Sequence, residues 1–233
     1  MSKHEKLHFK RARQPEQIEY RREEILRSAL IIFRQKGLEN VTLTDIAQEV
    51  GTVKSNLYRY FDSREHIYLN ILQRQGDAWE KRITSLLEKL AGKGTIAKVA
   101  NVITEAFMKS EDYCQLSTVV NSLLEKNLTP KHVINFRSVS FERRKRFAHI
   151  LAAALPNTSI EIIFPLTLPI FAQMVVLWSL GHPPPGPKKL LEKPEFAHLN
   201  HNFKKEMSRV IELILKGALG CEKRKAKILP GEA

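Results

Sequence analysis

Hydroxyl, amide, amine and phenol side chains gather in one short stretch of the chain, residues 41–67, VTLTDIAQEVGTVKSNLYRYFDSREHI. Such groups suit the phosphates and base edges of a nucleic acid. No catalytic set competes with them, because the eight histidines are scattered, none at a spacing from a Cys, Ser or acid that builds a nucleophile or a metal site, and no glycine-rich phosphate loop occurs. We therefore expect a binding protein and not an enzyme, with no metal and no cofactor.

The residue order in this stretch predicts two short helices joined at a glycine, followed by the start of a third. Thr42 and Asp45 have the spacing of a capping box, and Gly51 stands where a left-handed C-cap is favoured. Thr52 is expected to cap the second helix, and the third is expected to start at Asp62-Ser63. The predicted buried faces consist of apolar residues at helical spacing, namely Leu43, Ile46, Ala47, Val50, Leu57 and Phe61. This is the layout of a helix-turn-helix, whose second helix lies in the DNA major groove.

Many of these residues also recur in the order of one protein family. The matching residues are Thr42, Asp45-Ile46-Ala47, Gly51, Leu57-Tyr58-Arg59-Tyr60-Phe61 and Arg64-Glu65, preceded in the first helix by Ile25, Ala29, Phe33 and Gly37. Over about residues 20–70 the chain closely resembles the TetR family of transcriptional regulators. Three residues depart from the family pattern: Val53 replaces a capping Ser, Ser55 a common Gly, and Arg64 a Lys.

The resemblance implies a role for each exposed residue of the motif. Phosphate contacts are expected from Thr42, Lys54, Tyr58, Tyr60 and Arg64, and base contacts from Thr44, Ser55 and Asn56. The alternative is that Tyr58, Tyr60 and Phe61 only pack the small domain. Arg64 opposes the dipole of the helix that it begins, so we expect it to have an anionic partner.

Composition agrees with a polyanionic partner but does not locate the interface. The chain has 38 Lys and Arg against 25 Asp and Glu, a net charge of +13. Residues 1–19 form a basic arm that is either a solvated tail or an extension reaching the DNA backbone or minor groove. No apolar run resembles a signal peptide, and the two distant cysteines predict no disulfide framework, so a reduced cytoplasmic protein is expected.

The rest of the chain predicts an all-α protein, in which a three-helix DNA-binding domain precedes a larger helical domain for ligand binding and dimerisation. Helices are expected at about 63–90, from 95, from 112, at 130–155, 159–181 and 202–220, with HPPPGPKK as a proline-rich loop. The expected domains are a basic arm at 1–19, a helix-turn-helix domain at 20–66, an effector-binding and dimerisation domain at 67–221 and a basic tail at 222–233.

Residues 162–180 are uncharged and long enough to span a membrane. We favour a buried helix instead, because Pro165 and Pro169 would each interrupt the backbone bonding that a lipid-exposed helix needs. The resemblance implies a homodimer held together by a four-helix bundle, built here from helices at about 159–181 and 202–220 of each subunit. The prolines would kink the first of these helices and open space for a ligand.

An effector cavity is expected among the helices of the larger domain. Its candidate lining residues are Trp79, Ile83, Phe107, Leu123, Phe136, Ser140, Arg143, Phe147, Phe171 and Trp178, with plain core packing as the alternative for each apolar one. Arg143 falls on an apolar stripe, where it would bind a carboxylate or phosphate of an otherwise apolar ligand. The alternative is that Arg143 extends from a solvated face.

These expectations combine into a dimeric regulator that binds a palindromic operator on double-stranded DNA and is released by a small apolar or anionic effector. The alternative is an architectural or constitutive regulator whose helical domain only dimerises. A shielded cavity lined by aromatic residues, with a polar group inside, favours the first function; a fully packed core favours the second.

Overall fold

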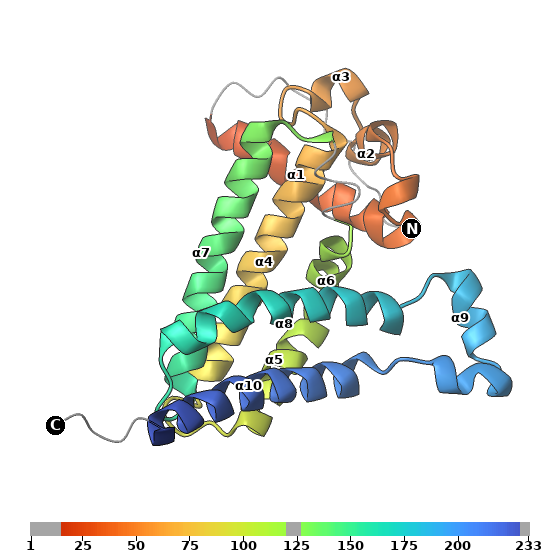
Figure 1. Ribbon diagram of the computed structural model, residues 1–233. Coiled ribbons are helices and arrows are strands. Elements are labelled where there is room, and N and C mark those ends of the chain that lie inside the picture. Colours follow the sequence, from red (N-terminus) through yellow and green to blue (C-terminus); the bar gives the residue numbers. More distant parts are fainter. Residues whose placement is uncertain (1–14, 120–126, 229–233) are drawn as a thin grey trace. The chain divides into compact units, whose positions relative to one another are not determined.

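The protein is described by a computed structural model covering residues 15–119 and 127–228, and within these ranges it contains helices and turns but no strand (Figure 1). This confirms the all-α prediction. The elements are α1 (Pro15–Lys36), η1 (Leu38–Asn40), α2 (Leu43–Val50), α3 (Lys54–Leu57), α4 (Arg64–Glu88), α5 (Ile96–Met108), α6 (Glu111–Ser117), α7 (Pro130–Ala154), α8 (Ile160–Gly181), α9 (Pro185–Leu191), η4 (Pro194–Leu199) and α10 (Phe203–Ile228).

The chain divides into two compact units. Unit 1 consists of residues 1–74 with 119–136, and unit 2 of residues 75–118 with 137–233. The long helices α4 and α7 therefore each contribute residues to both units. We describe each unit by itself.

Unit 1 is built on the packing of α1 against α2 and of α2 against α3. Its core is apolar, and its fully buried side chains include Ile25, Ile46 and Leu57. Tyr68 of α4 is also fully buried, and its hydroxyl donates to the carbonyl oxygen of Ala29 on α1 at 3.0 Å. Burial raises the pKa of Tyr68, so this phenol keeps its proton and stays a donor.

Unit 2 is a helical assembly in which α10 packs against α5 and α8, and α6 packs against α5 and α8. Figure 1 shows α8 and α10 running side by side. Trp178 of α8 lies edge-on to Phe203 of α10, with ring centroids 5.0 Å apart, and its indole nitrogen donates to Gln115 Oε1 at 3.0 Å. The one polar atom of this large side chain is therefore satisfied inside the unit.

Several helix starts follow local signals in the sequence. Thr95 caps α5 by accepting a hydrogen bond from the Lys98 amide at 3.3 Å. Pro130 begins α7, since its fixed φ and missing N–H suit the first helical position. Asn202 caps α10 by accepting from the Lys205 amide at 2.9 Å. These three predicted starts are confirmed.

The structure corrects three other expectations of secondary structure. The first helix begins at Pro15 and not near residue 20, and the predicted proline-rich loop contains α9, again with proline in its first turn. Proline fits the beginning of a helix, which explains both errors, and α8 even continues through the interior residues Pro165 and Pro169. The last helix continues past Gly220 to Ile228, because glycine also accepts the right-handed helical conformation.

Candidate nucleic-acid interface

The predicted capping box at the start of α2 is present. Thr42 Oγ1 accepts from the Asp45 amide at 3.1 Å, and the Thr42 amide donates to Asp45 Oδ2 at 2.8 Å. Lys36 Nζ binds the other oxygen of Asp45 at 2.8 Å. The hydrogen bond from Lys36 and those from Thr42 hold the pKa of Asp45 well below its usual range. The start of α2 is thus fixed by an ionised carboxylate.

The turn between α2 and α3 depends on Gly51. This residue has φ 75° and ψ 35°, the left-handed conformation predicted for it. A Cβ there would meet nothing within 4 Å, so glycine is needed for its backbone conformation and not for space. The Thr52 amide then donates to the carbonyl oxygen of Ala47 at 2.8 Å, which closes the end of α2.

The predicted cap of the next helix is wrong. Helix α3 starts at Lys54, so its N-cap is Val53, which makes no side-chain capping bond. Thr52 lies one residue too early, and its hydroxyl accepts from Asn56 Nδ2 at 3.0 Å instead. The helix itself spans only Lys54–Leu57 and is followed by turns through Tyr60.

Helix α3 places several predicted DNA contacts at the surface. Leu57 and Phe61 are buried, which directs the residues between and before them outwards. Tyr58 is 49% exposed, and Lys54 Nζ lies 5.9 Å from the centre of its ring. The other exposed predicted contacts are Ser55, Thr42 and Thr44, while Asn56 and Tyr60 are half-buried. Arg59, next to Tyr58, is also exposed, although it was not among the predicted DNA contacts.

Arg64 has the anionic partner that the helix dipole demanded. Its guanidinium binds Glu65 Oε1 at 2.7 Å. It also donates to the carbonyl oxygen of Val41 at 2.6 Å, in the segment that leads into α2. The sequence predicted a phosphate contact for Arg64, whereas in the structure its side chain holds the backbone before α2.

A brace from α1 was not foreseen. Arg22 donates to the carbonyl oxygen of Tyr60 at 2.5 Å, and its guanidinium lies 4.3 Å from the centre of the Phe61 ring. These contacts fix the backbone just after α3, where Tyr58 and Tyr60 project. Arg22 is 38 residues from Tyr60 in the sequence, so no local motif signals the pairing.

The structure brings part of the predicted effector set together in unit 2. The Trp79 ring centroid lies 5.1 Å from those of Phe107 and Phe171, and 5.3 Å from that of Phe147. Tyr113, which was not predicted, joins this aromatic cluster at 5.9 Å from Trp79. Burial raises the pKa of Tyr113 to about 12, so its phenol is neutral.

The remaining predicted lining residues are placed differently. Ile83 is fully buried, and Trp178 stacks on His182 with centroids 3.9 Å apart. Phe136 falls in unit 1, and Ser140 is half-buried. Leu123 lies outside the described residues.

Arg143 is buried, with 3% of its surface exposed, so the prediction of a solvated face is wrong. Its guanidinium pairs with Asp77 Oδ1 at 2.7 Å and lies 3.7 Å from Glu80 Oε2. A Cβ at Gly76 would lie 2.6 Å from Arg143 Cζ, so the absence of a side chain there makes room for the guanidinium. The charge expected to meet an anionic ligand is already balanced by two carboxylates.

Trp79 Nε1, in the aromatic cluster, and Thr104 Oγ1, on α5, are buried polar atoms that lack a hydrogen-bond partner. A buried donor without a partner costs free energy, and such atoms are uncommon in folded proteins. They mark positions where a ligand or a water would supply the missing bond.

Three possible metal ligands also meet in unit 1, although the sequence predicted no metal site. Asp62, His66 and His132 each present one ligand atom, and these atoms lie within 4.8 Å of one another. Asp62 lies two residues before α4, and His66 lies in the first turn of α4. The third member comes from the first turn of α7, which local spacing does not reveal.

Comparison with known proteins accounts for most of the chain. Residues 25–71 match the model of bacterial regulatory proteins of the tetR family, and residues 73–221 match that of the tetracyclin repressor-like C-terminal domain. The regulator RutR of Escherichia coli (strain K12) is 33% identical over 93 residues, 40% of this chain and 42% of RutR. IcaR of Staphylococcus aureus (strain Newman), a negative regulator of the biofilm operon icaADBC, is 40% identical over 47 residues, 20% of this chain and 25% of IcaR.

These matches span less than half the length of the two relatives. A solved transcriptional regulator of Rhodococcus sp. Rha1 shares the fold, with a TM-score of 0.56 at 14% identity over 84% of this chain and 96% of that one. The two family models together cover most of the described residues, and members of the family are transcriptional regulators and not enzymes. The chain belongs to the TetR family of transcriptional regulators.

Proposed function

We propose that this regulator is a dimeric repressor that binds a palindromic operator in double-stranded DNA and leaves it when a small apolar or anionic effector binds. One observation carries the DNA-binding part: Lys54, Ser55 and Tyr58 are exposed together on a short helix that Leu57 and Phe61 anchor in the core. The name of IcaR as a negative regulator supports the direction of control. Such a protein acts where the DNA is, in the cytoplasm.

The predicted DNA contacts are proposed to form two groups. Lys54, Tyr58 and Tyr60 are proposed to bind phosphates, and Thr44, Ser55 and Asn56 to face bases. Thr42 and Arg64 already bind Asp45 and Glu65, so their contribution to DNA binding would be mainly to position α2 and α3. Arg59 joins the proposed phosphate contacts because it is exposed beside Tyr58.

Apolar exposure on α8 and α10 supports the dimer. Leu168 and Val176 of α8 and Leu213 of α10 each expose more than half of their surface. Helix α8 is long and apolar enough to cross a membrane, and 28% of its most apolar window is buried inside the chain. A second copy would cover these side chains without a membrane. Two-fold symmetry would then set two reading helices about 34 Å apart, or a multiple of that, on a palindrome.

The aromatic cluster supports an effector site, since Trp79 Nε1 is buried there without a partner. A ligand that accepts this bond would have to enter among Trp79, Phe107, Phe147 and Phe171 and move these rings apart. The second candidate function, a regulator without an effector, is favoured by the tightness of the same cluster. Trp79, Phe107 and Phe147 are fully buried, with ring centroids at ordinary packing distances.

The decisive experiment is fluorescence-anisotropy binding of the untagged chain to DNA that flanks its own gene, over a salt series. We expect saturable, palindrome-dependent binding, weakened at least about tenfold in Tyr58→Ala, which removes an exposed contact without opening the core. The matched control is Tyr20→Ala, because Tyr20 is 55% exposed but lies on α1. Weak binding that is steeply salt-dependent and equal in both variants would contradict the proposal, because net charge alone would explain it.

A further inference from the structure

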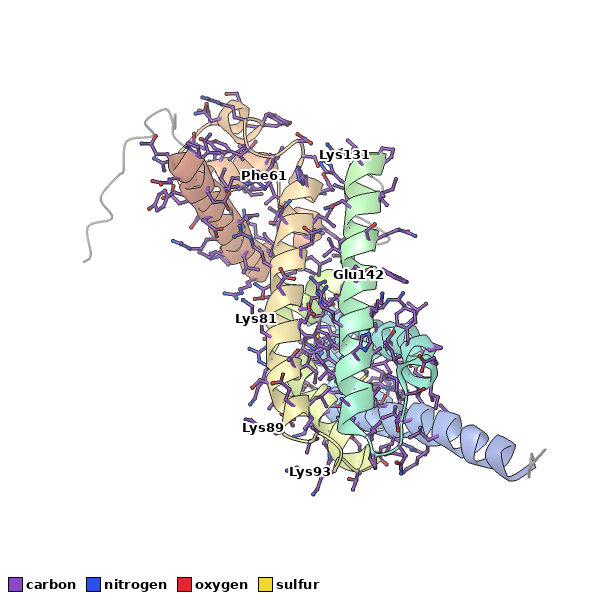
Figure 2. All side chains as sticks on the ribbon, turned by 90° about the vertical axis from the view of Figure 1, so that its left-hand side faces the viewer. Phe61, Lys81, Lys89, Lys93, Lys131 and Glu142 are labelled. Carbon is purple, nitrogen blue, oxygen red and sulfur yellow. The ribbon has the colours of Figure 1, made fainter. Side chains whose placement is uncertain are left out.

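Asp62, His66 and His132 form a compact cluster in unit 1 that the DNA-binding proposal does not use. Asp62 Oδ2 lies 3.4 Å from His132 Nε2 and 3.7 Å from His66 Nδ1. The two imidazole rings stack with centroids 3.9 Å apart. Figure 2 labels the preceding residues, Phe61 and Lys131, at the same end of α4 and α7.

The spacing of these atoms suits a transition metal. Ligands held at 2.0–2.1 Å in a tetrahedral zinc site are about 3.3 Å from each other. The two distances from Asp62 Oδ2 are close to this value before any ion draws the groups together. Two imidazoles and one carboxylate, with room for a water, are also an established ligand set for Zn²⁺ and its neighbours.

The surroundings prepare both histidines to act as ligands. Thr129 Oγ1 lies 3.1 Å from His132 Nδ1, which orients the ring with Nε2 towards Asp62. The Phe61 ring packs edge-on against the His66 ring, with centroids 5.6 Å apart, which holds the second imidazole in place. The Asp62 carboxylate is 65% exposed, so an ion can enter from solvent.

Three features of the site oppose binding. The amide of Asp62 donates to His66 Nδ1 at 3.3 Å, so this nitrogen is already in a hydrogen bond, and the guanidinium of Arg22, 4.3 Å from the centre of the neighbouring Phe61 ring, brings a positive charge close. The stacked rings must also tilt apart, because each nitrogen lone pair lies in the plane of its ring. The two imidazoles in the ligand set favour ions that bind imidazole strongly over Mg²⁺ and Ca²⁺, which prefer oxygen.

We propose that Asp62, His66 and His132 bind one divalent transition-metal ion of the Zn²⁺, Co²⁺ or Ni²⁺ class. The ion would link the segment after α3 to the first turn of α7, within unit 1. Tyr58 and Tyr60 precede Asp62 by only a few residues, so the ion would also stiffen the DNA-reading segment. This last consequence, a change in operator affinity, rests on the proposed function; metal binding does not.

The test is a Co²⁺ titration of the untagged, chelator-treated full chain, followed by visible absorption, with Zn²⁺ competition. We expect one equivalent of Co²⁺ to give the intense bands of a low-coordinate site with imidazole ligands, and Zn²⁺ to abolish them. His132→Gln should weaken binding by more than about tenfold, the lower bound for loss of a supporting group around a metal. The matched control is His149→Gln, an exposed histidine on the same helix, which should bind as the wild type does.

A second variant guards against misfolding. Asp62→Asn alters an exposed side chain, should keep the circular dichroism of the wild type, and should still weaken Co²⁺ binding. Zn²⁺ should raise the thermal midpoint of the wild type and not that of His132→Gln. The proposal is overturned if the spectrum stays that of the hydrated ion, or if His132→Gln and Asp62→Asn bind like His149→Gln. Failure of DNA binding with intact metal binding would count against the proposed function alone.

Discussion

The surface of α2–α3 in unit 1 and the aromatic cluster in unit 2 treat polar atoms in opposite ways. Around α2 the Thr42–Asp45 capping box is local in sequence, the longer-range contacts of Lys36 and Arg64 brace its start, and Lys54, Ser55 and Tyr58 stay exposed. Around Trp79 the polar atoms are buried, and their partners, where they have them, come from distant helices, as with Arg143 and Asp77. Unit 1 therefore leaves polar groups at its surface for a partner, whereas in unit 2 buried rings and ion pairs hold its own helices together.

The largest expected effect is on the aromatic cluster of unit 2. Trp79→Ala removes a fully buried ring that contacts four other aromatic side chains, so we expect a loss of about 3–5 kcal/mol in the free energy of unfolding. Urea unfolding followed by circular dichroism measures it. Phe141→Ala, at a 44% exposed ring, should cost about 1 kcal/mol or less. Equal losses in the two variants would mean that the cluster is loosely packed, and the contrast between the units would fail.

The next effect concerns the buried cation. Arg143→Met leaves Asp77 without this partner and removes one of the two cations beside Glu80, which keeps Arg146, and we expect about 2 kcal/mol of destabilisation. The loss is smaller than for a fully enclosed pair, because Asp77 is 58% exposed and water can solvate it. Chemical denaturation measures the free energy of unfolding. The control is Lys145→Met, at an exposed position of the same helix, so the difference between the two variants gives the effect of burying the cation. If both variants unfold alike, the ion pair contributes nothing net.

A backbone change sharpens the comparison on the unit 1 side. Gly51→Ala forces a side chain into the left-handed region, at a cost of about 1–2 kcal/mol, although no atom obstructs it. Gln48→Ala, exposed on the same helix, should be nearly neutral. Thermal unfolding gives both values. A neutral Gly51→Ala would show that the turn between α2 and α3 relaxes, and that the segment is less fixed than the caps indicate.

The smallest effect is a pH dependence in the capping box. The folded pKa of Asp45 is lower than its ordinary value of 3.8, so its stabilising contribution is complete above that pH and is lost as the pH falls through the folded pKa. Between about pH 4 and 2 the wild type should therefore lose stability more steeply than Asp45→Asn. Thermal midpoints across this range test the slope. Parallel curves would assign the acid sensitivity of the chain to other carboxylates.

The distance along the sequence between interacting residues explains which features could be predicted from the sequence. The starts of α2, α5 and α10 and the left-handed Gly51 depend on residues three or four positions apart, so their signals are visible in a single segment. The partners of Arg22, Arg143 and His132 lie 38, 66 and 70 residues away, and their pairing is set by how helices pack. Thr52 shows the limit of the local signals, since a shift of one residue moved the cap to Val53.

The position of the two tryptophans has a practical consequence. The chain has only Trp79 and Trp178, both in unit 2, while Tyr58, Tyr60 and Tyr68 lie in unit 1. Selective excitation of the indole rings therefore gives fluorescence from unit 2 and none from unit 1. A shift of the emission maximum on adding a small molecule would report binding near Trp79 and its neighbours. Unchanged emission while α1–α3 unfold would show that the two units unfold at different times. The two tryptophans therefore serve as intrinsic fluorescent probes of unit 2, in which the effector site is proposed.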